Sequence, residues 1–115
     1  FKELFDKKAV DVAMPDIARV GGLQETKNIC ALAEAYGLSV SPHNFSSGIL
    51  LAATIHLMAS TPNAILLEYD TSDNAIYEEL LIEPLELKDG KIKVPHHPGL
   101  GVTLRKETLV KYAIK

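Results

Sequence analysis

Three short apolar runs, each closed by a polar residue, recur at nearly equal intervals and constrain the fold more than any other feature. Asp16 follows the first run, His43 the second and Glu68 the third, at intervals of 27 (43 − 16) and 25 (68 − 43) residues. Such an interval accommodates a strand, a helix and two loops, the content of a βαβ unit. Parallel strands end at a common edge, where α/β proteins carry their chemistry. We therefore predict that Asp16, His43 and Glu68 lie at the C-terminal ends of three consecutive parallel strands.

The three runs are predicted as strands, and the segments between them as helices. None of the runs alternates cleanly between apolar and polar residues, which is typical of parallel strands that are buried on both faces. The intervening segments carry apolar residues at helical spacing. We expect an α/β fold with strands over 10–14, 38–41 and 64–67 and helices over 1–8, over about 13 residues capped by Gly37, and over 49–58.

The sequence changes character after Asp70. Residues 85–94 alternate around Asp89-Gly90, which is the strongest local signal for a β-hairpin. The expected elements of this part are a short helix over 75–80, the hairpin, and a final helix over 105–114.

Composition excludes several classes of function. The 115 residues form one domain or part of one. A net charge of −3 provides no basic field for nucleic acid, and charges and prolines keep every apolar run below the ~18 residues of a membrane span. The single Cys30 has no disulfide partner and cannot build a Cys-based zinc site. We therefore expect a core thiol at Cys30 and a reducing, cytoplasmic location.

Three βα units do not make a complete sheet. A (β/α)₈ barrel needs about 250 residues, and an open sheet of three parallel strands leaves two edges unpaired. We therefore expect the chain to complete its sheet with another polypeptide segment or with a copy of itself.

Several motifs, taken together, resemble those of one enzyme family. Met14-Pro15-Asp16 is followed by Gly21-Gly22, and Ser41-Pro42-His43-Asn44 comes one βα unit later. Further agreement lies in residues 52–62, 67–70, 89–92 and 98–101. With these motifs, the chain resembles the mandelate racemase/muconate lactonizing enzyme family of the enolase superfamily over essentially its whole length.

The resemblance implies a fold and a division of the chain. Family members have an N-terminal α+β capping domain and a modified TIM barrel. Residues 1–70 would be the last three βα units of that barrel. Residues 71–115 would be a C-terminal extension, with the hairpin and the final helix, that packs toward the capping domain.

The resemblance also implies roles for the three strand-end residues. His43 would be the general acid/base that takes a proton from the carbon α to a carboxylate. Asp16 would hold one ring nitrogen and stabilise the imidazolium, and Glu68, in its protonated form, would donate a hydrogen bond to the enediolate. The family's Mg²⁺ ion would be bound by carboxylates on three earlier strands, so no metal ligand is expected in this chain.

The presence of Asp16 and His43 together resembles mandelate racemase and the acid-sugar dehydratases. The first hypothesis is therefore a Mg²⁺-dependent dehydratase that converts a sugar acid to a 2-keto-3-deoxy acid, with the rest of the barrel and the capping domain as partners. Two alternatives stay open. One is a racemase, epimerase or cycloisomerase of the same family, and the other is an inactive fragment that folds by association.

Other polar residues allow two interpretations each. Asn44 and Ser41 either contact substrate or satisfy loop backbone. Arg19 either reaches the rim of the site or forms a surface ion pair. His56 is expected to pack in or beside the core, and the pair His96-His97 to lie on the surface or in an interface.

Overall fold

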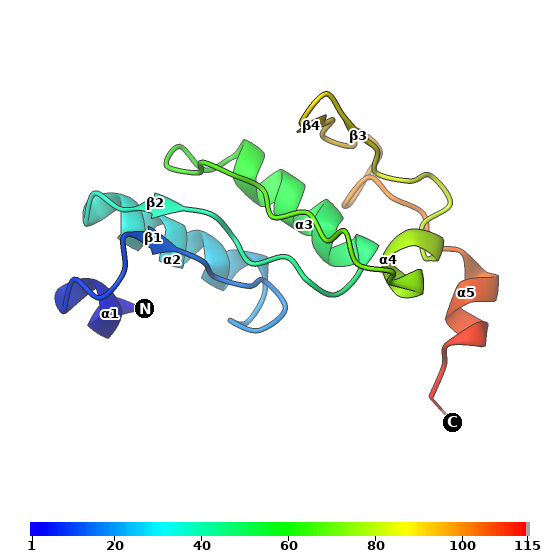
Figure 1. The fold of residues 1–115 in the computed structure, drawn as a ribbon, viewed down its shortest axis with the longest axis horizontal. Helices are drawn as coiled ribbons and strands as arrows, with labels where there is room; N and C mark the ends of the chain where they lie inside the picture. Colours follow the sequence, from blue (N-terminus) through cyan, green and yellow to red (C-terminus); the bar gives the residue numbers. More distant parts are fainter. Residues whose placement is uncertain (115) are drawn as a thin grey trace.

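Parallel strand pairing organises the N-terminal half of the chain. The computed structural model describes residues 1–114, so Lys115, the last residue of the predicted C-terminal extension, lies outside the described part. Figure 1 shows the elements in chain order, with α1 toward one end of the long axis and α5 toward the other. They are α1 (Lys2–Asp6), β1 (Val12–Ala13), α2 (Leu23–Ala35), β2 (Ser39–Val40), α3 (Gly48–Ala59), α4 (Ala75–Glu79), β3 (Leu87–Lys88), β4 (Lys91–Ile92) and α5 (Lys106–Lys111).

The predicted parallel order of the three apolar runs is confirmed. β1 pairs with β2 in parallel, with Val12 opposite Ser39. The third run continues the order through a single parallel bridge between Val40 and Ala64. The strands are therefore shorter than predicted, and the third is reduced to one bridge.

A proline explains where the ladder stops. Val40 donates its N–H to Asn63 O at 2.9 Å and accepts from the N–H of Ile65 at 3.0 Å. In a parallel ladder the next N–H on this edge belongs to the residue two positions on, which is Pro42 and has no N–H to give. The pairing of β2 with the third run therefore ends after one residue pair.

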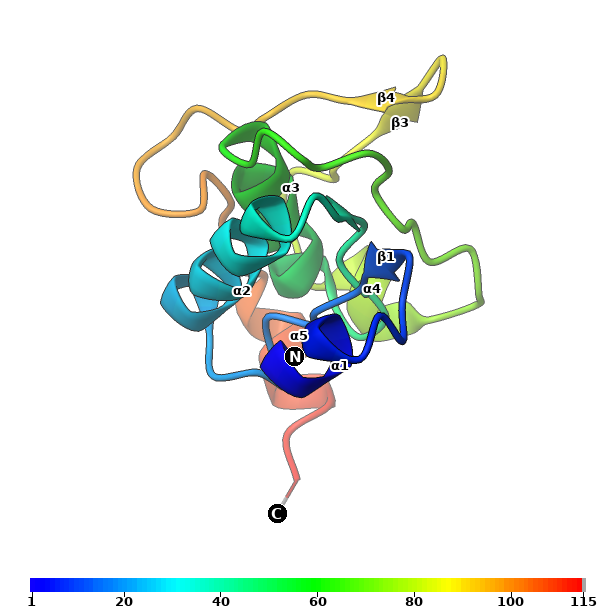
Figure 2. The same cartoon turned by 90° about the vertical axis from the view of Figure 1, so that its left-hand side faces the viewer.

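Two helices cover one face of this short sheet. Figure 2 shows α2 and α3 side by side on the same side of β1. α2 ends as predicted, because Gly37 has φ 71° and the Leu38 N–H reaches Ala33 O at 2.9 Å, the hydrogen bond of a Schellman cap. The core between the helices and the sheet contains Phe5, Ala13, Ile17, Ile29, Cys30, Ala33, Val40, Leu50, Ala53 and Leu57.

The opposite face of the sheet is open in this chain, which differs from the prediction of strands buried on both faces. Met14 follows buried Ala13 and is 48% exposed, and Ile65 follows the bridged Ala64 and is 51% exposed. Residues 1–114 therefore leave about half of the surface of each of these two side chains uncovered.

The C-terminal half packs against α3. Leu51 and Ile55 of α3 form a second apolar cluster with Tyr77 of α4. The hairpin is confirmed as β3 and β4, joined by Asp89 and Gly90 with φ of 51° and 72°, the backbone that a type I′ turn requires. Within residues 1–114, no helix is long and apolar enough to cross a membrane.

Gly101→Ala is expected to destabilise the protein more than Gly99→Ala. Both glycines have φ 73°, a left-handed conformation that costs an alanine about 1–2 kcal/mol. A Cβ on residue 101 would also clash with Pro95 Cβ, whereas one on residue 99 meets nothing within 4 Å. Overpacking of this kind adds about 1–3 kcal/mol.

Urea denaturation followed by circular dichroism measures both losses. Equal losses for the two variants would contradict the close approach of Gly101 to Pro95.

Candidate active site

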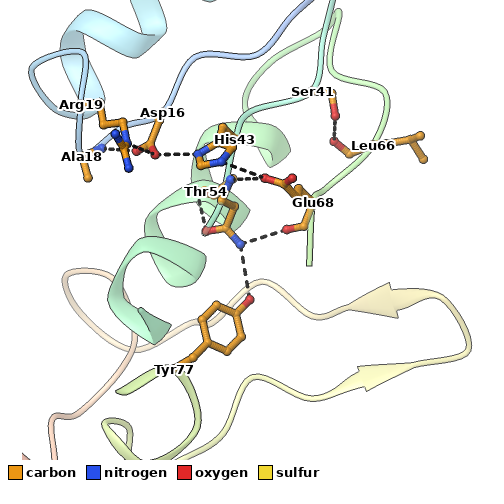
Figure 3. A network of polar contacts seen from close by, with 10 residues as sticks. Asp16, Ala18, Arg19, Ser41, His43, Thr54, Leu66, Glu68 and Tyr77 are labelled. Atoms are coloured by element: carbon orange, nitrogen blue, oxygen red, sulfur yellow. Dashed lines mark hydrogen bonds and ion pairs between the residues drawn. The ribbon is translucent and has the colours of Figure 1, made fainter. Parts of the chain in front are cut away.

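The register of β1 and β2 brings Asp16 and His43 together. Both residue pairs of the two strands are offset by 27 positions, and Asp16 and His43 are separated by the same number. Past the strands, the alignment continues through the His43 N–H, which donates to Pro15 O at 3.1 Å. Asp16 Oδ2 and His43 Nδ1 lie 2.8 Å apart (Figure 3). The 27-residue interval in the sequence is therefore the register of the sheet.

Asp16 is a buried carboxylate with several partners. Only 6% of the residue is exposed, its Oδ1 accepts a hydrogen bond from the Ala18 N–H at 2.8 Å, and Arg19 Nε lies 3.3 Å from Oδ2. Burial alone would raise the Asp16 pKa. The hydrogen bonds from His43 and Ala18, together with the positive charges of His43 and Arg19, outweigh burial and hold this pKa below its usual value. Asp16 is therefore ionised at neutral pH.

His43 has one ring nitrogen engaged and the other directed toward Glu68. The side chain is 35% exposed, and its Nε2 lies 4.0 Å from Glu68 Oε2. An ionised carboxylate at Nδ1 favours the tautomer with the proton on that nitrogen, which leaves Nε2 to accept a proton. The Asp16–His43 pair can therefore act as an oriented acid/base.

Glu68 lies at the same edge as the pair. Its Oε2 accepts the Asn44 N–H at 2.6 Å. The structure thus brings together the three residues that the sequence placed at strand ends.

Ser41 and Asn44 both bind backbone of the third run. Ser41 Oγ donates to Leu66 O at 3.0 Å, and Asn44 Nδ2 donates to Glu68 O at 2.9 Å. Asn44 is fully buried. Of the two interpretations for Asn44, the structure shows the hydrogen bond to loop backbone, and the expected substrate contact stays a prediction. The expected substrate contact of half-buried Ser41 stays a prediction.

Sequence reasoning missed two residues of this network. Thr54 Oγ1 lies 3.5 Å from Asn44 Oδ1, and Tyr77 Oη lies 3.4 Å from Asn44 Nδ2. Thr54 was detectable in principle, since it is a polar residue within the apolar run of α3. Nothing in the sequence linked Tyr77 to the site, because it belongs to the segment after Asp70.

The remaining polar candidates have structural surroundings. Arg19 is 76% exposed yet pairs with Asp16, so the two interpretations of Arg19 are compatible. His56 Nε2 lies 3.1 Å from Leu100 O, which fits the predicted packing role. Cys30 is a buried free thiol, as predicted, and burial raises its pKa.

No metal site is formed by the described part of the chain. Residues 1–114 contain no group of three or more His, Cys, Asp or Glu side chains placed to hold a metal ion. The candidate residues therefore do not fit a bound metal by themselves.

Comparison with known proteins gives a consistent result. A family described as "Enolase C-terminal domain-like" matches residues 1–108. D-xylonate dehydratase of Haloferax volcanii is 39% identical over 103 residues, which are 90% of this chain and 25% of that protein. D-galactarolactone cycloisomerase of Agrobacterium fabrum is 32% identical over 112 residues, 90% of this chain and 30% of that protein.

Solved structures agree with the sequence matches. The 3,6-anhydro-D-galactonate cycloisomerase of Zobellia galactanivorans superposes with a TM-score of 0.90 at 38% identity, covering 99% of this chain and 32% of that one. The homologues as a group are acid-sugar dehydratases and mandelate racemase-like enzymes of the enolase superfamily. The chain spans 25 to 32% of the length of the three relatives described.

Asp16→Asn is expected to destabilise the protein at neutral pH by about 1.5–3 kcal/mol, the usual contribution of a hydrogen bond to a charged group. Because the folded-state pKa of Asp16 is lowered, its stabilisation is fully present above the unfolded value of about 3.9 and is lost as pH falls through the folded value. The difference between wild type and variant should therefore shrink only below about pH 4.

Urea denaturation across pH 2–7 measures this difference, with Asp11→Asn, at an exposed position before β1, as the control. A gap that is absent at pH 7, or undiminished in acid, would contradict the account of Asp16.

Proposed function

Because the chain belongs to the enolase C-terminal domain-like family, we propose that it is the C-terminal part of a sugar-acid dehydratase. The relatives that support this proposal include dehydratases of D-xylonate, arabinonate and D-gluconate. The substrate proposed for the complete enzyme is a sugar acid, and the product is a 2-keto-3-deoxy acid.

The observation that carries the proposal is the 2.8 Å contact between Asp16 Oδ2 and His43 Nδ1. This contact leaves His43 Nε2 on the side of Glu68, 4.0 Å from its Oε2. Nε2 of His43 would remove the proton from the carbon α to the substrate carboxylate. Asp16 would hold the Nδ1 proton and stabilise the imidazolium that results. General acid/base catalysis by a positioned histidine contributes about 10²–10⁴-fold to a rate.

Elimination would complete the reaction with the same histidine. The electron pair left by the departing α-proton is first held in the enediolate, and it then forms the double bond between the α and β carbons as the C–O bond to the β-hydroxyl breaks. His43 returns its proton to that hydroxyl, which leaves as water, and the enol product tautomerises to the 2-keto-3-deoxy acid. A neutral Glu68 would donate a hydrogen bond to the enediolate oxygen before the hydroxyl departs.

A second candidate is an isomerase of the same family. The cycloisomerases of Agrobacterium fabrum and Zobellia galactanivorans favour it, at 32% and 38% identity. In a racemase or epimerase, a lysine base on the face opposite His43 would allow proton transfer on both sides of the carbon. That residue would belong to another segment of the protein.

The proposed Mg²⁺ ion would also depend on another segment, because residues 1–114 form no metal site. When bound, such an ion would stabilise the enediolate.

We further propose that residues 1–70 are the last three βα units of a modified TIM barrel. The open sheet face, with exposed Met14 and Ile65, supports this proposal because a closed barrel would bury it. Residues 71–115 would then be the extension toward the capping domain. The partners are therefore the rest of the barrel and the capping domain, and the expected cytoplasmic location stays a prediction.

His43→Ala in the full-length protein is expected to abolish exchange of the α-proton with solvent, a loss of at least about 10²-fold. Asp16→Asn should lower the same rate, because the imidazole loses its orienting carboxylate. Deuterium incorporation into D-xylonate, arabinonate, D-gluconate and D-galactonate, followed by NMR, measures the rates. His97→Ala, at an exposed position of the Pro/Gly loop, is the matched control.

An exchange rate in His43→Ala equal to that of wild type would refute the assignment of the base. Equal losses in His43→Ala and His97→Ala would also refute it.

The chain expressed alone is expected to associate and to lack turnover, since its open sheet face would be left in water. Light scattering after size exclusion should give a mass above the 12.5 kDa of one chain. A stable 12.5 kDa monomer that does not bind a hydrophobic dye would contradict the proposed incomplete barrel.

A further inference from the structure

Asn44 and Glu68 are joined by two hydrogen bonds, beyond the point where the ladder between β2 and the third run ends. Val40 and Ala64 are bridged at an offset of 24 positions, and Asn44 and Glu68 are separated by the same number. His43 and Glu68 are separated by 25 positions, one more than the offset of this bridge. The residue best placed to control Glu68 is the buried asparagine beside the histidine.

Asn44 binds the third run where its backbone ladder with β2 has ended. Pro42 supplies no N–H, so past Ile65 the third run has lost its regular pairing with β2. Its carbonyls at Leu66 and Glu68 are instead bound by the side chains of Ser41 and Asn44, at 3.0 and 2.9 Å. Two side-chain hydrogen bonds, to carbonyls that a regular ladder with β2 would not use, thus hold the third run where backbone pairing has ended.

The same asparagine also fixes the carboxylate. Its N–H reaches Glu68 Oε2 at 2.6 Å, while its side-chain amide binds the Glu68 carbonyl. The amide itself is held from behind by Thr54 and Tyr77, and the residue is fully buried. A side chain so enclosed has little rotational freedom. Glu68 is therefore held at both its backbone and its carboxylate by one residue.

We propose that Asn44 is a positioning residue for Glu68, an inference that rests on the proposed function. By occupying Oε2, its N–H confines the proton of a neutral Glu68 carboxyl group to Oε1. Oε1 accepts no hydrogen bond from residues 1–114, so it is the oxygen that can donate to the enediolate. Asn44 thus selects which oxygen of Glu68 acts and holds Oε2 4.0 Å from His43 Nε2.

Asn44→Ala in the full-length protein should lower kcat for α-proton exchange by about 10- to 100-fold with little change in KM, the effect of a misplaced catalytic group. Asn63→Ala is the matched control. Asn63 Nδ2 binds Leu38 O at 2.9 Å, in the same kind of backbone clamp at the other end of the strand. The control should lose stability but keep kcat.

A double-mutant cycle separates positioning from general support. If Asn44 acts through Glu68, then Asn44→Ala should cause little further loss in the Glu68→Ala background. An unchanged kcat in Asn44→Ala, equal losses in Asn44→Ala and Asn63→Ala, or an additive loss in the double variant would each overturn the proposal.

A spectroscopic measurement needs neither substrate nor an Asn44 variant. The Asn44 backbone amide proton, bound to Glu68 Oε2, should resonate far downfield in wild type and move upfield in Glu68→Ala. An unchanged position would overturn the proposal even if Asn44→Ala fails to fold. Exchange of the α-proton at the wild-type rate in His43→Ala would instead refute the proposed function. The amide measurement would still test whether Asn44 positions Glu68.

Discussion

The parallel register of β1 and β2 is the constraint on which the rest of the site depends. Its 27-residue offset places the buried carboxylate of Asp16 opposite the imidazole of His43. The two side chains then lie 2.8 Å apart. A shift by one residue would turn the side chain of either partner to the other face. The helices α2 and α3 fix that register, because Ala13 and Val40 are buried against them. The packing that buries Ala13 and Val40 therefore also places Asp16 beside His43.

Pro42 determines how the third run is held against β2. The proline ends the ladder between β2 and the third run. The position of Glu68 therefore depends on the side-chain hydrogen bond from Asn44, whereas the position of His43 depends on its backbone hydrogen bond to Pro15. Side-chain hydrogen bonds can be changed without disturbing a sheet. The placement of Asp16 and His43 is therefore set by the sheet register, and that of Glu68 by Ser41, Asn44 and the adjoining Tyr77.

The sequence predicted the features that local chemistry or register determines. The interval from Asp16 to His43 located the dyad because it equals a strand offset, and Asp89-Gly90 located the hairpin because few turns accept positive φ at two successive residues. The interval of 25 from His43 to Glu68 was less informative, because the third run is bridged to β2 at an offset of 24 and only at Val40 and Ala64. The open sheet face and the contact of Tyr77 were not predictable, because both depend on packing between segments distant in the chain.

The central claim is that Asp16 holds the Nδ1 proton of His43, so that Nε2 is the atom that exchanges a proton with substrate. The ¹⁵N chemical shifts of the two ring nitrogens of neutral His43 test this claim most directly. The account predicts a protonated Nδ1 and an unprotonated Nε2 in wild type, with the tautomer preference lost in Asp16→Asn. A proton on Nε2 in the wild-type protein would contradict it.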